Sequence, residues 1–516
     1  MDEKRQVTRA AGIIGLATLL SRILGFVRDM VIAWFFGAGR LSDAFFVAFR
    51  VPNLMRRLFA EGTLSMAFVP VFTDQMTRYG REEAFALARS AVRMLSLILA
   101  LLTVAGIAGA PWIVKVVAPG FAGSKFALTV TLTRIMFPYI ICICLVALSM
   151  GILNSLGHFA APALAPVFLN LAMIGAVLFI APHLETPVIA LAVGVLAGGV
   201  IQLALQVPFL VRKGVVIWQK ASIWHPALKK VGLLMGPAVF GAAVYQINIL
   251  VGTLLASLLA EGSVSYLYYA DRLVQFPLGI FAISTSVAVL PSLSRQAAAR
   301  DYEALADTFA YSMNLILFIT IPSMAGLIVL REPIVGLLFM RGAFDSESMR
   351  LTAYALFHYS VGLWAFSSVR ILVSTFYALQ DTKTPVKMAT YSIIANIALG
   401  VILMGPFNHG GLALATSLGS MINFILLAAV LQRRMGGLHW KMIVFSAART
   451  VVCSTIMGAA LFWAHRAFPP DYKGPDLYLL AYVFTAVTVG IIIYIACCAV
   501  LQRGEMKSFV SMVKRS

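Results

Sequence analysis

The chain has 516 residues, of which 61% are hydrophobic and only 12% are charged, and its mean hydropathy is +0.91. So few charged side chains cannot cover the surface of a water-soluble protein of this size, so the composition excludes a soluble fold and indicates an integral membrane protein. The 40 Lys and Arg residues outnumber the 21 Asp and Glu residues, but membrane proteins concentrate basic residues in cytoplasmic loops, and we expect no nucleic-acid partner.

Apolar runs of about 20 residues, the length that crosses a bilayer, occur fourteen times along the chain. In chain order, the predicted spans are approximately 10–36, 42–72, 86–110, 129–155, 162–181, 187–211, 231–259, 264–294, 306–330, 351–378, 386–404, 411–432, 444–464 and 477–501. The charged N-terminal segment leads into a first run that is too long for a signal-peptide core, so we expect it to be retained. The predicted fold class is an all-α integral membrane protein with fourteen transmembrane helices.

Basic residues alternate between the two sides of these predicted spans. The loops and tails on the side of the N-terminus carry more than twice as many Lys and Arg residues as those on the opposite side. Because cytoplasmic loops are the ones enriched in Lys and Arg, this asymmetry supports an even number of spans with both termini in the cytoplasm.

An internal repeat relates the two halves of the chain. A shift of about 222 residues brings AFR at 48–50 onto ADR at 270–272, and LFA at 58–60 onto IFA at 280–282. The shift carries the first span onto the seventh, so we predict two six-helix lobes related by a pseudo-two-fold axis along the membrane normal. The predicted divisions are an N-terminal lobe at 1–220, a C-terminal lobe at 221–435, and a final helix pair with a cytoplasmic tail at 436–516.

Five arginines lie inside predicted spans rather than at their ends. A charge at the centre of a membrane helix costs about 2.5 to 3.5 kcal/mol on insertion scales, so such residues ordinarily face a water-filled cavity. They are Arg22 and Arg28 in the first span, Arg50 and Arg57 in the second, and Arg272 in the eighth.

Helical spacing places these charges on particular faces. In the second span, Asp43, Arg50, Arg57 and Glu61 fall within one stripe at 100° per residue, and that stripe cannot face lipid. Arg50 corresponds to Arg272 by the repeat, so each half would present one equivalent arginine.

The first span separates its two arginines. Arg22 and Asp29 share a face, whereas Arg28 points about 120° away from Arg22, and Gly25 between them would allow a bend. In the eighth span, Gln275 lies one turn beyond Asp271 and adds a neutral polar group.

Internal pairing, such as Arg28 with Asp43 or Arg57 with Glu61, is the alternative explanation of these charges. Six arginines, counting Arg56, face four acids within these three spans, so pairing alone leaves positive charge over. Guanidinium groups bind phosphate oxygens through two hydrogen bonds and stay protonated at physiological pH. The predicted substrate is therefore a molecule that carries phosphate or pyrophosphate.

Several motifs then suggest a family. The runs SRILGFVRD at 21–29, GAG at 37–39, DAFFVAFRVPNLMRRLFAEGTLSMAFVPVF at 43–72, YYADRL at 268–273 and QDTKTPVK at 380–387 resemble those of lipid II flippases of the MurJ (MviN-like) type. These proteins belong to the multidrug/oligosaccharidyl-lipid/polysaccharide (MOP) exporter superfamily. The resemblance extends from about residue 10 to residue 500.

The resemblance implies two six-helix lobes around a central cavity and a C-terminal helix pair that borders a hydrophobic groove. It implies a multi-pass protein of the bacterial cytoplasmic (inner) membrane that moves lipid II, an undecaprenyl-pyrophosphate-linked disaccharide pentapeptide, to the outer leaflet by alternating access. With the residue pattern, it assigns pyrophosphate binding to Arg22, Arg28, Arg57 or its neighbour Arg56, and Arg272. The polar residues expected to line the cavity or its gates are Asp29, Asp43, Arg50, Glu61, Asp271, Gln275, Arg370 and Lys383.

Two positions depart from the pattern of the family. Some members have an acid where this chain has Gln275, which removes any carboxylate role there. A sodium site is associated with the seventh helix in some members, but this chain offers Gln246 and Asn248 there and no acid, so we expect neither sodium coupling through that segment nor any cofactor.

Other functions predict other residues. An enzyme acting on the same lipid would need a metal-ligand cluster or a long catalytic loop, an exporter of hydrophobic cations would need buried acids and aromatic side chains, and a structural partner would need no charges inside helices. We therefore expect a transporter rather than an enzyme, with a flippase for another undecaprenyl-linked oligosaccharide or a multidrug exporter as the alternatives. The expected partners are lipid II and membrane lipids, with the cell-wall synthesis machinery as a further candidate, and we expect a monomer.

Overall fold

The computed structural model describes residues 2–57, 63–216, 219, 222–472 and 476–501, and every element within them is helical. The all-α prediction is confirmed. The chain divides into two compact units, Met1–Val264 and Ser265–Ser516, and we describe each by itself.

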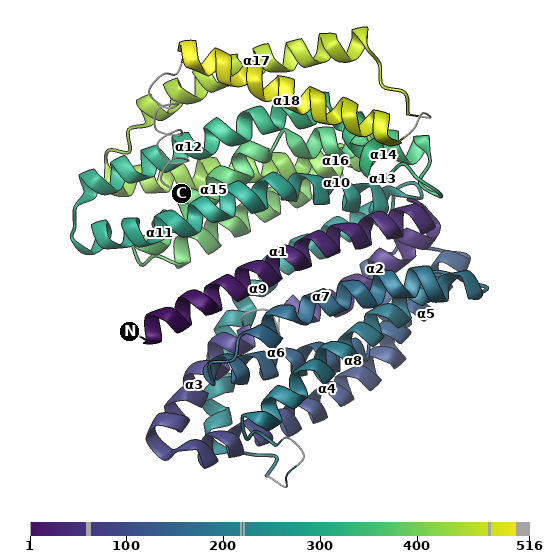
Figure 1. The fold of residues 1–516 in the computed structure, drawn as a ribbon, viewed down its shortest axis with the longest axis vertical. Coiled ribbons are helices and arrows are strands. Elements are labelled where there is room, and N and C mark those ends of the chain that lie inside the picture. Colours follow the sequence, from purple (N-terminus) through teal and green to yellow (C-terminus); the bar gives the residue numbers. More distant parts are fainter. Residues whose placement is uncertain (1, 58–62, 217–218, 220–221, 473–475, 502–516) are drawn as a thin grey trace. The chain divides into compact units, whose positions relative to one another are not determined.

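The first unit contains a series of long helices that lie side by side (Figure 1). In chain order they are α1 (Asp2–Phe36), α2 (Arg40–Met55), α3 (Thr63–Tyr79), α4 (Arg81–Val117), α5 (Gly123–Met136), α6 (Tyr139–Ser155), α7 (Ala160–Gly175) with its short extensions η2 (Ala176–Ile180) and η3 (Ala181–His183), α8 (Ile189–Arg212) and α9 (Pro226–Ser257).

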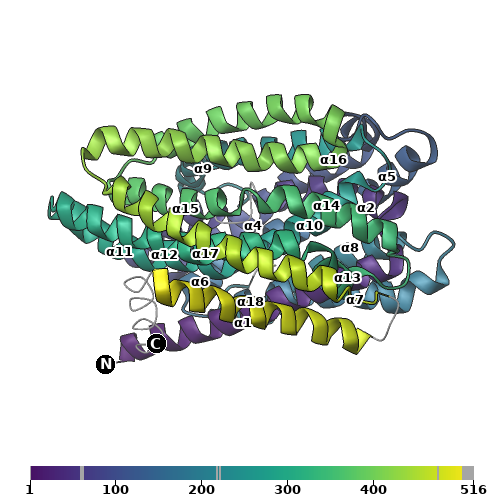
Figure 2. The ribbon, with the colours of Figure 1, turned by 90° about the horizontal axis from the view of Figure 1, so that it is seen from above.

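The second unit begins within the first turn of the next helix. Its elements are α10 (Ser263–Pro277), η4 (Leu278–Ala282), α11 (Ile283–Ala298), α12 (Tyr302–Val329), α13 (Arg331–Phe339), α14 (Ser346–Ser360), α15 (Leu363–Ala378), α16 (Lys383–Met435), α17 (Trp440–Ala467) and α18 (Asp476–Leu501). The last two helices lie against each other in both views, and α17 also packs on α12 (Figures 1 and 2).

Nine helical stretches within the described residues are long and apolar enough to cross a membrane, or ten if the bent pair α14 and α15 forms one span. Part of the difference from the predicted fourteen comes from α16, which counts once but covers two predicted spans, 386–404 and 411–432. The predicted span 42–72 also includes residues that the structure does not describe. The multi-pass architecture is thus present, and the count of fourteen stays a prediction.

The longest helix, α16, is a hairpin of two helices. Asn408 has φ 49° and ψ −135°, which no helix contains. Past this residue, a Cβ on Gly411 would lie 2.1 Å from the carbonyl oxygen of Leu403, although eight residues of continuous helix would separate them by about 12 Å. The Ser392 hydroxyl likewise donates to the carbonyl of Gly419. The chain therefore reverses at Asn408.

Small residues set the packing of α7 against α8. A Cβ on Gly194 would lie 2.7 Å from the Cβ of Ala176, and one on Gly198 would lie 2.7 Å from Leu169. Glycines four residues apart on one helix face let two membrane helices approach closely, which raises their dispersion attraction where no hydrophobic effect assists association. This interface holds α7, and with it Asn170, in place for α1.

The repeat found in the sequence recurs in the backbone. Residues with positive φ lie at corresponding breaks between helices in the two halves of the chain, at offsets of 219 to 225 residues. The pairs are Gly37 and Gly262, Gly80 and Arg300, Gly123 and Gly342, Gly157 and Gln380, and Gly214 and Gly436. At one pair the hydrogen bonds also correspond, since His158 N donates to Leu153 O at 2.8 Å and Asp381 N donates to Phe376 O at 2.9 Å. Such agreement supports a true duplication.

The duplication and the compact units divide the chain at different points. The helix that corresponds to α1 by the repeat is α9, yet α9 packs against α3 and α4 within the first unit. The lobe boundaries predicted at 220 and 435 remain predictions. Because α9 packs within the first unit, one face of α9 lies beside α2.

Candidate functional site

The first candidate site lies where α1 packs against α7. Arg28 forms a side-on pair with the neighbouring Asp29, in which Nε and Nη2 donate to Oδ1 at 3.0 and 2.7 Å. Its Nη1 donates to Oδ1 of Asn170 on α7 at 3.0 Å. The side chains of Arg28 and Asp29 are only 12% and 2% exposed, so the guanidinium is held in a fixed plane within the helix packing.

Arg22 occupies a different environment on the same helix. Its side chain is exposed, whereas that of Arg28 is largely buried, and α1 continues as one helix through Gly25 between them. The two arginines that the motif groups together therefore differ in accessibility, as their 120° separation predicts.

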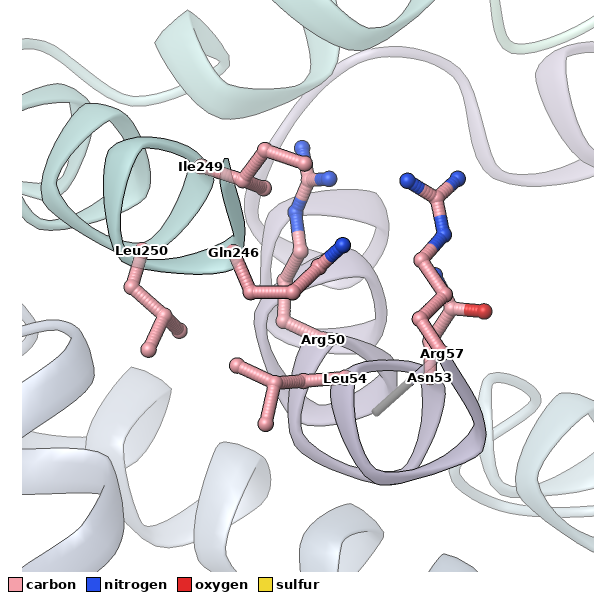
Figure 3. A pocket seen from close by; sticks show the side chains of 7 residues that line it. All are labelled: Arg50, Asn53, Leu54, Arg57, Gln246, Ile249 and Leu250. Carbon is pink, nitrogen blue, oxygen red and sulfur yellow. The ribbon is translucent and has the colours of Figure 1, made fainter. Parts of the chain in front are cut away.

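The second candidate site is a pocket between α2 and α9, within the first unit (Figure 3). It is small, with about 10 Å³ of enclosed space, and is lined by Arg50, Asn53, Leu54, Arg57, Gln246, Ile249 and Leu250. The guanidinium groups of Arg50 and Arg57 extend to the same side of α2, and the Gln246 side chain reaches toward them from α9 (Figure 3). Two cations and a neutral amide among apolar side chains make a site that favours an anion.

Asn53 connects this pocket to the neighbouring arginine. Nε and Nη2 of Arg56 both donate to Oδ1 of Asn53, at 3.1 and 2.9 Å. The pocket is lined by Arg57 rather than Arg56, so of the two arginines that the motif left open, Arg57 is the one that faces this space.

Asp43 holds helices together at the start of α2. Its buried carboxylate accepts from Lys125 Nζ on α5 and from the backbone N–H of Gly262, both at 2.8 Å. The Lys125 ammonium also lies 4.1 Å from the ring centre of Phe121. Asp43 is thus fastened to α5 and to the segment after α9, and it does not line the arginine pocket.

The second unit holds Arg272 against an aromatic ring. Its Nη2 donates to the hydroxyl of Tyr268 at 2.9 Å, and the guanidinium lies 4.9 Å from the centre of that ring. One turn further on, Gln275 Nε2 donates to Asp271 at 2.8 Å. A glutamate at this position would repel Asp271 instead, so the amide is matched to its neighbour.

The remaining predicted residues lie apart from these sites. Arg370 and Lys383 are exposed, and Glu61 falls outside the residues that the structure describes. The Lys383 amide donates to Asp381 at the start of α16. Hydrogen bonds from the Thr384 amide and hydroxyl, together with the charge of Arg434, hold the pKa of the Asp381 carboxyl below its ordinary value.

Two contact residues were absent from the sequence prediction. Asn170 and Lys125 lie on α7 and α5, and each binds a predicted site residue from far along the chain. An amide or a lysine in an apolar run is a weak signal by itself, because such residues often hydrogen-bond locally or extend to the membrane surface.

An all-helical fold with many membrane-capable helices and buried arginine sites defines a multi-pass membrane transporter. Residues 32–484 match the family described as lipid II flippase MurJ. The chain belongs to this family, and the prediction drawn from its motifs is confirmed.

Relatives agree over most of their lengths. The chain is 39% identical over 469 residues to the probable lipid II flippase MurJ of Vibrio cholerae, with 89% of each chain covered. It is 41% identical over 426 residues to the lipid II flippase MurJ of Burkholderia cenocepacia, covering 81% of this chain and 82% of that one. For the Rhizobium meliloti relative, a probable lipid II flippase MurJ, identity is 37% and coverage is 98% and 95%.

Solved structures share the fold. A lipid II flippase MurJ in an inward closed conformation is similar with a TM-score of 0.80 and 28% identity, covering 95% of this chain and 98% of that one. An inward-facing multidrug resistance MATE family transporter of the MOP superfamily is similar with a TM-score of 0.69 and 16% identity, covering 81% and 95%. The similarity to the MATE family transporter shows only that the two proteins share a fold.

Proposed function

We propose that this protein moves lipid II from the inner to the outer leaflet of the bacterial cytoplasmic membrane by alternating access. Membership of the MurJ family supplies the substrate. A lipid with a pyrophosphate and a large polar head crosses a bilayer only if the head passes through a polar environment while the tail stays in apolar surroundings. The residues of the two arginine sites are suited to the head.

The observation that carries this proposal is the pocket of Arg50, Arg57 and Gln246. Guanidinium groups donate fixed pairs of hydrogen bonds that fit phosphate oxygens, and their charge does not depend on pH. The neutral amide adds donors without cancelling that charge. A cavity for hydrophobic cations would require acids instead.

The substrate-binding set in this proposal comprises Arg22, Arg28, Arg56 or Arg57, and Arg272. Asp29, Asp43, Arg50, Glu61, Asp271, Gln275, Arg370 and Lys383 serve the polar cavity and its gates. The final helix pair, α17 and α18, shelters the polyprenyl tail. The protein acts as a monomer, without a catalytic step, beside the cell-wall synthesis machinery.

Fourteen spans with both termini in the cytoplasm belong to the same proposal. The reversal at Asn408 supplies two spans from α16, and the bent pair α14 and α15 supplies one. The excess of Lys and Arg in the loops on the N-terminal side supports a cytoplasmic location for those loops.

Complementation of a bacterial strain depleted of its own lipid II flippase tests this function. The wild-type chain should restore growth, and Arg28→Ala and Arg272→Ala should each fail at equal membrane abundance. Arg134→Ala is the matched control, because this exposed α5 arginine donates to the backbone carbonyl of Ile107 and lies outside the arginine sites, and it should complement.

Growth rescue by both Arg28→Ala and Arg272→Ala would refute the pyrophosphate site. Failure of the well-expressed wild-type chain would instead assign the protein to another undecaprenyl-linked oligosaccharide.

A further inference from the structure

Asn170 on α7 is a buried amide with two specific contacts. The residue is only 5% exposed. Oδ1 accepts from Arg28 Nη1 at 3.0 Å, and Nδ2 donates to the backbone carbonyl of Ser21 at 3.1 Å. The orientation of the amide is fixed by chemistry, because a guanidinium cannot accept a hydrogen bond and a carbonyl cannot donate one.

Helix geometry explains how one amide contacts residues seven positions apart. A long side chain on a helix points back toward the N-terminus, so the Arg28 guanidinium lies beside the preceding turns. Carbonyl groups point toward the C-terminus, so that of Ser21 is directed at the level of Gly25. Asn170 lies at this level, since a Cβ on Gly25 would be 3.6 Å from its Nδ2.

We propose that Asn170 is a positioning residue that orients the Arg28 guanidinium for the pyrophosphate, and this inference rests on the proposed function. Nε and Nη2 of the guanidinium donate to Asp29, and Nη1 donates to Asn170. The two residues therefore restrain the guanidinium from opposite ends. The anchor to the Ser21 carbonyl keeps the amide itself from rotating.

A neutral amide suits this role better than an acid. Asp29 already pairs with Arg28, so a carboxylate at position 170 would place a second negative charge beside the guanidinium and disfavour an anionic substrate. The amide restrains the guanidinium through a hydrogen bond while leaving the net charge unchanged. A change of charge at position 170 should therefore affect substrate affinity beyond its effect on packing.

The test measures initial translocation rates in proteoliposomes against the concentration of a fluorescent undecaprenyl-pyrophosphate disaccharide pentapeptide. Asn170→Ala should weaken the apparent affinity about tenfold, because the Arg28 guanidinium would lose its fixed orientation and would have to be ordered when the substrate binds. Asn170→Asp, which keeps the size of the side chain, should weaken it further. Combining Asn170→Asp with Asp29→Asn restores one acid and one amide around Arg28 and should recover affinity relative to Asn170→Asp alone.

Gln202→Ala supplies the matched control. Gln202 is also a buried amide in this unit, and its Nε2 donates to the Ala165 carbonyl at 2.7 Å, which bridges α8 and α7. Its loss should leave the apparent affinity at the wild-type value.

Three results would overturn the role of Asn170: wild-type affinity in Asn170→Ala, equal weakening in Gln202→Ala, or no recovery in the double variant. Failure of the proposed function has a different signature, because then the wild-type protein would not translocate this lipid or Arg28→Ala would translocate it normally.

Discussion

The arginines of the first unit are held in place by uncharged as well as charged groups. Arg28 has Asp29 and Asn170 around it, Arg56 has Asn53, and the pocket of Arg50 and Arg57 includes Gln246. Amides fix a guanidinium through hydrogen bonds without neutralising it. These amides therefore restrain the arginines without adding negative charge of their own.

Replacing Gln246 by Glu should abolish this advantage at the α2 pocket. A carboxylate there would pair with Arg50 or Arg57 and compete with the substrate, so we expect translocation to fall at least about tenfold. Gln246→Met keeps a neutral side chain of similar size and should retain most activity. Equal activity of the Glu and Met variants in the proteoliposome assay would argue against an anion in this pocket.

Replacing Arg22 by Lys should also impair translocation. Lysine keeps the charge but loses the planar pair of donors that fits phosphate oxygens. The measurement is the initial flipping rate at matched membrane abundance. Full activity of Arg22→Lys would indicate that charge alone suffices at this exposed position.

At the scale of helices, close packing between helices holds the site residues in position. The α7 and α8 interface depends on Gly194, whose added Cβ would lie 3.1 Å from the Cα of Met173 as well as close to Ala176. Backbone atoms cannot move aside at small cost, so the two helices would have to separate, and Asn170 would shift with α7.

We expect Gly194→Ala to lower the free energy of unfolding by about 1 to 3 kcal/mol, the usual cost of overpacking. Gly109→Ala on α4 is the control, because a Cβ there meets no atom within 4 Å and alanine favours helix. Unfolding in lipid bicelles would compare the two variants. Equal stability would show that the interface relaxes.

The α15 to α16 turn gives a prediction on pH. Since the folded pKa of Asp381 is lowered, chiefly by hydrogen bonds from Thr384, its ionised form stabilises the fold above the unfolded pKa of about 3.9. This contribution is lost as the pH falls through the folded pKa. Asp381→Asn should be slightly less stable than wild type at pH 7, and the difference should shrink as the pH falls below the unfolded pKa and disappear below the folded pKa. A difference that persists in acid would exclude the ionised carboxylate as its cause.

At the scale of the whole molecule, export of an anionic lipid is linked to the membrane potential. Moving one elementary charge across ~100 mV is worth ~2.3 kcal/mol, and an inside-negative potential favours outward movement of an anion. An inside-negative potassium diffusion potential imposed with valinomycin should therefore accelerate export. A potential of the opposite polarity should slow export. Identical rates under both polarities would indicate that no net charge crosses the field.

The membrane class, the helical fold and the helices that carry charge could be predicted from the sequence. These properties depend on local quantities, namely the hydropathy of about 20 consecutive residues and the cost of placing an arginine among them. The repeat was also visible, and it recurs in the positive-φ residues at corresponding breaks between helices. The motifs were sufficient to indicate the family, because each is a run of consecutive residues that can be read without the fold.

Tertiary structure alone decided which groups surround each arginine. Asn170 is 142 residues from Arg28, Lys125 is 82 residues from Asp43, and Gln246 comes to the pocket from α9. No local pattern determines these contacts, because they depend on which helix faces pack together and on glycines that set the distance between helices. The sequence by itself determined that cations lie within the membrane helices, and the packing decided how each one is oriented.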